Sequence, residues 1–432
     1  MLTARRRVVA SAAVVLAGAL TLASCGGSDG GGSADARTLR LWHYEAPNSA
    51  MGIAWTEAIK EFEARHPGVE VKFEEKGFDQ IQKTAPMVLN SSDAPDLMEY
   101  NKGNATAGLL SKQGLLTDLS AEATKRGWDK LLSPGVRTTS QYDKSGVMGS
   151  GNWYGVPNYA EYAMVYFNKD LFAKYRLSEP KTFDDLVAAM DTFVGNDITP
   201  LANSGAEYLA QQYVYQLALS KADRAWVDSY ELYKGEADFH DAAWTYAAET
   251  FADWVEKGYI AKSSTSAKAE DAGVSFLRGK APILFSGSWW YGRFQDEAAF
   301  DWGTTLWPDT RLTPGSGGNL WVVPKNAKNK DLAYDFIDIT LSKKIQNLLG
   351  NKGGVPVAAD AAAVTDPRAK QLITQFDTVS DRDGLAFYPD WPVPGFYDVL
   401  VSQTQRLLTG STDPDAYLDA LQEAYDKGVP KR

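Results

Sequence analysis

Aromatic rings beside carboxylates are the residues in this sequence that best fit a chemical task. The chain has 13 Trp and 21 Tyr, and several of them stand where apolar runs end, next to Glu, Asp, Asn or Gly. A pyranose has an apolar C–H face that stacks on an aromatic ring, and its hydroxyls bond to carboxylates and amides. These clusters therefore indicate contacts to a sugar. They lie at residues 42–45, 153–161, 287–291, 319–321 and 390–392.

Motifs of the common enzyme classes are missing from the sequence. The three histidines, His43, His66 and His240, form no HExxH run, and the single cysteine offers no thiol cluster for zinc. There is no G-x-S-x-G elbow, Walker loop or dinucleotide fingerprint after a strand. A pair of carboxylates for glycoside hydrolysis can always be chosen from 55 acidic residues, so such a pair carries no weight. We expect no catalytic residue, no metal and no cofactor.

Tryptophans within helical patterns are expected in the core, whereas the adjacent pair Trp289 and Trp290 is not. Two neighbouring residues after a strand cannot both point into one core. At least one of this pair should therefore face a cleft. The expected core tryptophans are Trp55, Trp128, Trp244 and Trp254.

The first 25 residues have the parts of a bacterial export signal. Arginines 5–7 precede an apolar run at residues 8–22, which is too short for the roughly 20 residues of a membrane-spanning helix. The run ends at Cys25 in a pattern that resembles the lipobox. We expect residues 1–24 to be a lipoprotein signal peptide and Cys25 to carry acyl chains such as palmitate. Two weaker alternatives are an unmodified cysteine and, from the arginines, twin-arginine export.

Charge and cysteine content narrow the setting further. The formal net charge is −11 and the lysines are interleaved with acids, so a nucleic acid is not an expected partner. With Cys25 lipidated, no thiol remains for a disulfide. Residues 25–36 are rich in Gly and Ser and predict a flexible lipidated tether. The remaining length suffices for two domains with their own cores.

Apolar periodicity predicts alternating strands and helices from residue 38 onward. Residues 38–44 and 69–76 read as strands on either side of a helix at 50–66, a β-α-β unit. A helix at 79–90 and a strand at 95–100 follow. Such alternation predicts mainly parallel sheets covered by helices.

The rest of the chain is more helical. Thr182 caps a helix that ends near Phe193, with Asp185 as its reciprocal capping partner. No long polar linker divides the body, so any two lobes must be joined by several crossings. The other expected helices lie at 208–219, 242–257, 331–341, 343–349 and 414–427, and the other expected strands at 281–285, 302–307 and 319–324.

Five segments, taken in order, resemble the extracellular solute-binding proteins of bacterial ABC importers, specifically the carbohydrate-uptake class (solute-binding protein family 1). Each is weak alone, but their order together with the lipobox is specific, and the resemblance covers nearly the whole chain. The segments are FEARHPGVEVKFEE, SSDAPDLMEY, WYGVPNYAEYAMVYFNKDLF, FLRGKAPILFSGSW and GSGGNLWVVPKNAKNKDLAYDFI.

The resemblance implies an α/β, two-lobed, periplasmic-binding-protein-like (type II) fold with a hinge and an interlobe ligand cleft. It implies a monomeric lipoprotein on the outer face of the cell membrane, without enzymatic activity. Such a protein captures a sugar or oligosaccharide outside the cell and delivers it to an ABC permease with its cytoplasmic ATPase. The first lobe is expected at residues 37–155 plus 282–330, and the second, more helical lobe at 156–281 plus 331–432.

Carrying the family's contact segments onto this chain gives a set of expected ligand contacts. Asp96 has an equally good alternative as a turn or cap residue after Pro95. Trp391 is added from its proline-flanked loop rather than from the resemblance. The ligand would touch both lobes and favour the closed form. The expected contacts are Trp42, Glu45, Asp96, Asn101, Tyr159, Glu161, Trp289, Trp290, Gly318, Asn319 and Trp391.

Two other functions remain open. A binding protein for a non-sugar ligand would share the fold, and the acidic residues of the expected cleft suit a polyamine. A secreted glycoside hydrolase would share the aromatics and acids, but it needs two carboxylates at a fixed separation with one pKa raised. Phosphate-bearing ligands fit less well, because only Arg293 and Arg382 lie near the candidate loops.

Overall fold

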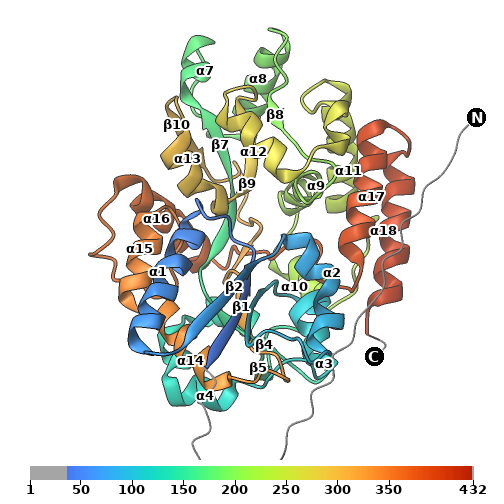
Figure 1. Ribbon diagram of the computed structural model, residues 1–432. Helices are drawn as coiled ribbons and strands as arrows, with labels where there is room; N and C mark the ends of the chain where they lie inside the picture. The colour runs from blue at the N-terminus through green and yellow to red at the C-terminus, as the bar shows by residue number, and fades with distance from the viewer. Residues whose placement is uncertain (1–36, 431–432) are drawn as a thin grey trace, which may run out of the picture. The chain divides into compact units, whose positions relative to one another are not determined.

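Two β-sheets form the centre of the structure, and helices cover them (Figure 1). The computed structural model describes residues 37–430, so the expected signal peptide, the expected tether and Cys25 lie outside the described residues. The first sheet has the order β2-β1-β3-β12-β6, and the second β10-β7-β9-β8, with β11 paired to β7. The strands are β1 (Thr38–His43), β2 (Glu70–Glu75), β3 (Leu97–Tyr100), β6 (Val156–Pro157), β7 (Glu161–Asn168), β8 (Leu201–Ala202), β9 (Ile283–Gly287), β10 (Trp302–Thr305), β11 (Gly315–Ser316) and β12 (Leu320–Val322), and a separate ribbon joins β4 (Gln141–Tyr142) to β5 (Asn152–Trp153).

The sheets are mixed, which corrects the prediction of mainly parallel sheets. β1 pairs in parallel with β2 and β3, and β8 with β9, but β12 and β7 pair antiparallel with their neighbours. The chain enters β12 of the first sheet from β11, which pairs with the second sheet. It enters β7 of the second sheet from β6, which belongs to the first sheet. β12 and β7 therefore run against the strands beside them.

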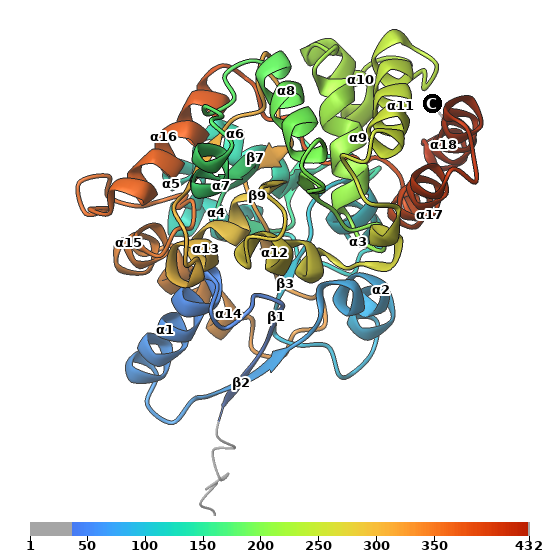
Figure 2. The ribbon, with the colours of Figure 1, turned by 90° about the horizontal axis from the view of Figure 1, so that it is seen from above.

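Strand pairing also changes the expected grouping of residues 282–330. β9 and β10 pair with β7 in the second sheet, and of the described strands in that segment only β12 joins the first sheet. Helices α14 and α15, expected in the second lobe, pack against α1 beside the first sheet (Figure 2). The sequence pattern locates elements but does not encode their partners. The remaining limits of the two lobes stay a prediction.

The expected helices are confirmed to within one or two residues at their ends. Thr182 and Asp185 form the expected capping box, with the Asp185 amide donating to Thr182 Oγ1 at 3.1 Å. Within residues 37–430 no helix is long and apolar enough to cross a membrane. The helices are α1 (Ala50–Arg65), α2 (Phe78–Leu89), α3 (Leu109–Lys112), α4 (Ser120–Arg126), α5 (Trp128–Leu131), α6 (Pro134–Arg137), α7 (Lys169–Lys174), α8 (Phe183–Val194), α9 (Leu209–Leu219), α10 (Arg224–Leu232), α11 (Ala242–Glu256), α12 (Ala269–Leu277), α13 (Tyr291–Glu297), α14 (Lys330–Thr340), α15 (Lys343–Asn351), α16 (Pro367–Asp381), α17 (Phe396–Thr409) and α18 (Pro414–Gly428).

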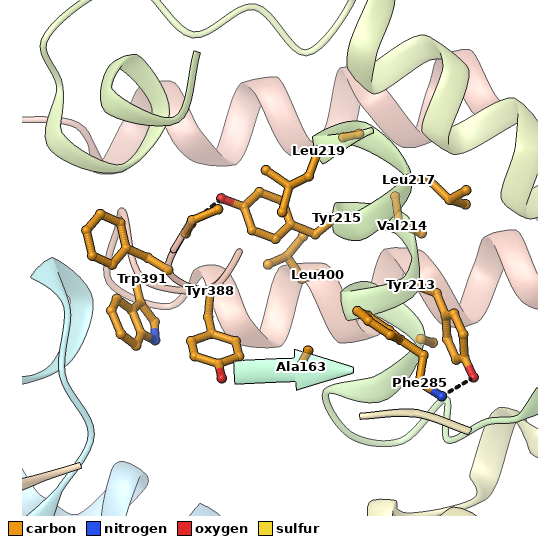
Figure 3. Close-up of a cluster of buried hydrophobic side chains, with 14 of the residues drawn as sticks. Ala163, Tyr213, Val214, Tyr215, Leu217, Leu219, Phe285, Tyr388, Trp391 and Leu400 are labelled. Carbon is orange, nitrogen blue, oxygen red and sulfur yellow. Dashed lines mark hydrogen bonds between the residues drawn. The ribbon is translucent and has the colours of Figure 1, made fainter. Parts of the chain in front are cut away.

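Strand β7 is buried along its whole length and separates two hydrophobic clusters. Because strand side chains alternate, Ala163 and Val165 face one cluster while Tyr162 and Met164 face the other. Figure 3 shows part of the first cluster, where α9 packs over β7 and β9. Both clusters lie within the compact unit Arg37–Arg432, so this unit has its own core. The four tryptophans expected in the core, Trp55, Trp128, Trp244 and Trp254, are all buried.

Candidate ligand-binding site

A cavity of about 250 Å³ is lined by residues that follow strands of the first sheet and by residues of the second sheet and its helices. Most of the expected contacts line it, although they come from distant parts of the chain. This clustering does not test ligand contact, so their binding role stays a prediction. The expected contacts that line the cavity are Glu45, Asn101, Tyr159, Glu161, Trp289, Trp290, Asn319 and Trp391.

Five of the lining side chains form one polar network. Tyr159 donates to Glu45 Oε1 at 3.2 Å and accepts from Asn319 Nδ2 at 2.7 Å. Lys102 Nζ donates to Asn319 Oδ1 at 2.9 Å and forms an ion pair with Glu161. All five are at least nine-tenths buried. The network therefore links groups from both sheets through buried hydrogen bonds.

The fold explains why these five side chains meet. Glu45 follows β1 and Lys102 follows β3, and these strands are parallel neighbours whose carboxyl ends lie at the same edge. Tyr159 and Asn319 lie in the two segments that cross between the sheets, β6 to β7 and β11 to β12. Glu161 is the first residue of β7, opposite β11. The crossings thus bring the second sheet to the edge of the first.

Gly318 lies in the segment that crosses from β11 to β12, and it does not line the cavity. Its φ is +70°, and a Cβ there would lie 1.7 Å from the carbonyl oxygen of Tyr159. Only glycine fits such a close approach. The structure supports a backbone role for Gly318 in holding Tyr159 and Asn319 together.

Burial sets the protonation of the cavity carboxyls. It raises the pKa of Glu45 to about 7, an effect that the Tyr159 hydrogen bond opposes and the Glu161 charge reinforces. Burial also raises the pKa of Asp390 to about 6. Behind the cavity, burial and the nearby Glu45 hold the pKa of Glu99 well above its ordinary value, while Asn158 Nδ2 donates to it at 2.7 Å. The ligand-free cavity therefore carries less negative charge near neutral pH than its composition implies.

Aromatic rings form much of the cavity wall. Trp289 is half-buried, and its Nε1 donates to the Tyr208 hydroxyl at 3.2 Å. Its ring lies 6.2 Å from that of Tyr388, measured between centroids. The Lys102 ammonium stands 5.6 Å from the Tyr388 ring centroid and 5.3 Å from that of Trp391. These rings could stack on the apolar face of a sugar.

The loop that carries Tyr388, Asp390 and Trp391 is fixed from both sides. The Tyr215 hydroxyl of α9 donates to the Ala386 carbonyl at 2.7 Å (Figure 3). The Tyr230 hydroxyl of α10 donates to the Pro389 carbonyl at 2.5 Å. On the other side, the Ala105 amide donates to the Trp391 carbonyl at 2.8 Å. This wall of the cavity is therefore set by buried hydrogen bonds outside it.

Asp96 and Trp42 were expected to contact ligand, but neither lines the cavity. Asp96 Oδ2 accepts from the Arg40 amide at 3.0 Å, and Oδ1 accepts from the Lys328 and Asn329 amides, each at 2.9 Å. These bonds fix the start of α14 to β1, so the structure favours the alternative cap role. Trp42 packs among buried side chains of α2 in the first hydrophobic cluster.

Several lining residues were missed by the sequence reasoning. Lys102 and Asp390 stand directly beside the expected Asn101 and Trp391, so neighbourhood alone could have indicated them. Tyr208, Gln212 and Tyr397 lie at or within helices that carry no distinctive motif. No group of His, Cys, Asp and Glu within residues 37–430 is arranged to hold a metal ion.

Comparisons with known proteins identify a family and relatives that this chain resembles. The family model "Bacterial extracellular solute-binding protein" matches residues 47–347. A maltotriose-binding protein of Pyrococcus abyssi is 25% identical over 352 residues, covering 76% of this chain and 68% of the relative. A maltooligosaccharide ABC transporter solute-binding lipoprotein of Streptococcus pneumoniae (strain ATCC BAA-255 / R6) is 25% identical over 303 residues, covering 66% of this chain and 64% of the relative.

The fold is shared with solved structures. A chitin oligosaccharide binding protein superposes with a TM-score of 0.78 at 22% identity, covering 91% of this chain and 99% of that chain. The expected two-lobed, periplasmic-binding-protein-like (type II) fold is confirmed. The chain belongs to the family of bacterial extracellular solute-binding proteins.

Proposed function

We propose that this protein captures a sugar or an oligosaccharide outside the cell and delivers it to an ABC permease. The observation that carries the proposal is the cavity itself, in which aromatic rings stand beside buried carboxylate and amide groups. The names of the two relatives above, one for maltotriose and one for maltooligosaccharides, support a saccharide. The protein acts as a binding protein and performs no catalysis.

Capture would proceed by a shift between open and closed forms. Glu45 follows β1 and Asn319 directly precedes β12, both strands of the first sheet. Glu161 begins β7 of the second sheet, and Trp289 lies in the turn after β9. A ligand that contacts both sets favours the form in which the sheets approach each other. Only this difference in contacts between the two forms can drive closure.

Anchoring would place the protein at the membrane that holds its permease. Acylation of Cys25 supplies the anchor, and the pneumococcal relative is named as a lipoprotein. We expect Cys25→Ser to move the protein from the membrane fraction to the medium. Retention of the Cys25→Ser chain in the membrane fraction would contradict lipid anchoring.

The proposal is tested by thermal unfolding of the chain from residue 26 against saccharides, polyols and polyamines, with the sugars then checked for breakdown. A ligand at about 100 times its dissociation constant adds about 2.7 kcal/mol to the free energy of unfolding. A rise in the melting temperature with an intact saccharide supports sugar capture. A rise with polyamines alone would move the function to the non-sugar alternative, and cleaved sugar would identify a hydrolase.

A further inference from the structure

We propose that the sugar bound in this cavity carries a free amino group, which Asp390 and Glu45 recognise as a cation. The inference rests on the proposed function, because it names the class of sugar that the same site takes. It starts from the hydrogen-bonding groups that the protein leaves without partners.

The basic side chains that line the cavity already form ion pairs with acidic side chains. Lys102 is paired with Glu161, and Arg293 Nη1 lies 2.7 and 2.9 Å from the two carboxylate oxygens of Glu270. Within residues 37–430, Asp390 and Glu45 form no ion pair with any base. The cavity therefore presents two carboxyl groups without an ion-pair partner in the described part of the chain, although the nearby Lys102 charge lowers the pKa of both.

These carboxyl groups also have free acceptor capacity. Within the described chain Asp390 accepts no hydrogen bond from another residue, and Glu45 receives its bonds from Tyr159 and Asn319 on Oε1 alone. Among the described residues, the hydroxyls of Tyr44, Tyr388 and Tyr397, which also line the cavity, have no hydrogen-bond partner either. An ammonium group has three donors and no acceptor, whereas a hydroxyl is both donor and acceptor. The free carboxyl oxygens of Asp390 and Glu45 therefore match the donors of an ammonium group.

The surroundings of the two carboxyl groups favour a cation too. The Lys102 ammonium over Tyr388 and Trp391 shows that this aromatic wall accommodates a positive charge. Burial of an unpaired carboxylate is costly, and a bound cation offsets that cost while a neutral ligand adds to it. The titratable and charged groups that interact with Asp390 or Glu45 are Lys102, Glu161, Glu99, Glu231, Tyr44, Tyr159, Tyr215, Tyr230, Tyr388 and Tyr397.

The direction of proton exchange separates the two kinds of ligand. The pKa values of Glu45 and Asp390 are raised to about 7 and about 6, so both groups are partly protonated near neutral pH. A bound ammonium lowers these pKa values and releases protons. A neutral sugar desolvates the groups further, raises the pKa values and takes protons up.

Titration calorimetry of the chain from residue 26 at pH 6.5 tests the proposal. The probes are glucosamine and its β-1,4-linked oligosaccharides, their N-acetylated counterparts, malto-oligosaccharides and spermidine. Two buffers of different ionisation enthalpy give the number of protons exchanged. We expect an amine-bearing saccharide to bind at least about ten-fold more tightly than its acetylated counterpart, about 1.4 kcal/mol, and to release protons.

Variants assign the effect to the two carboxyl groups. Asp390→Asn and, separately, Glu45→Gln should lower the affinity for the amine-bearing saccharide by about ten-fold or more. Each variant should also reduce the preference of the protein for this saccharide over the acetylated form. Asp296→Asn, the same change at an exposed aspartate outside the cavity, is the matched control and should change neither affinity. Melting curves confirm that each variant is folded.

Each outcome decides the inference. Neutral or acetylated sugars binding as tightly as the amine, with proton uptake, would overturn the inference and leave sugar capture intact. If spermidine binds and no saccharide does, both the inference and the proposed sugar capture are overturned. No binding of any amine-bearing saccharide would also overturn the inference.

Discussion

At the scale of single residues, the cavity combines aromatic rings with carboxyl groups whose protonation is set by burial. Glu45 is the clearest case, since it stands at the end of β1 and is held by Tyr159 and Asn319. A carboxyl with a raised pKa stabilises the folded state at low pH and loses this contribution as pH rises. Ionisation of Glu45 near neutral pH therefore lowers the free energy of unfolding of the ligand-free protein.

Glu45→Gln should stabilise the ligand-free protein in a pH-dependent way. The pKa of Glu45 rises from 4.5 to about 7 on folding, so ionising it at pH 8 costs up to about 3 kcal/mol. The neutral variant avoids this cost. Its melting temperature should exceed that of the wild type at pH 8 and converge with it as pH falls through 7 toward 4.5. A difference that stays constant across this range would contradict the assigned pKa.

Trp289→Ala should weaken saccharide binding by about ten-fold or more, equal to about 1.4 kcal/mol, because it removes a half-buried ring from the cavity wall. Titration calorimetry measures the loss. Met87→Ala, which changes a side chain on α2 that is 70% exposed, is the control. Equal affinities of the two variants would exclude Trp289 as a sugar contact.

At the scale of helices, strands and loops, local pattern and distant pairing differ in what the sequence reveals. The helix that begins after Thr182 was predictable because its cap and apolar face are local. The partners of β9 were not, because they depend on contacts with β7 far away in the chain. The same dependence on distant contacts explains which cavity residues could be predicted. Glu45 stands at a recognisable strand end, whereas Trp42 faces α2 and Asp390 lies in a loop whose position depends on α9 and α10.

Asp96→Ala should destabilise the fold without weakening ligand binding. The change removes the acceptor of three partly buried backbone amides that join β1 to the start of α14, and an amide left unpaired costs up to about 1–3 kcal/mol when it is buried. Chemical denaturation measures the loss. Asp93→Ala, at an exposed aspartate three residues earlier, should leave stability nearly unchanged. A folded Asp96→Ala protein with lost sugar affinity would restore the ligand-contact role.

Tyr230→Phe should loosen the cavity loop from behind. It leaves the Pro389 carbonyl without its donor, and the expected loss is about 1 kcal/mol of stability together with a several-fold lower ligand affinity. Tyr246→Phe, on α11 and half-buried outside the cavity, is a matched control. Unchanged affinity in Tyr230→Phe would show that the loop holds its place without this bond.

At the scale of the assembled protein, two sheets joined by crossings place polar and aromatic side chains around one cavity. The crossings carry Tyr159 and Asn319, so movement of one sheet relative to the other would act directly on the polar network. We expect the radius of gyration in solution to fall when ligand binds. Small-angle scattering with and without ligand measures it, and an unchanged radius would contradict ligand-induced closure.

Sugar capture without chemistry is tested most directly by calorimetric titration of the chain from residue 26 with a panel of saccharides, followed by analysis of the recovered sugar. The expected result is saturable binding of one saccharide group at a single site, with every sugar recovered intact and affinity reduced by Trp289→Ala. Recovery of cleaved sugar, or saturable binding of polyamines with none of any saccharide, would contradict it.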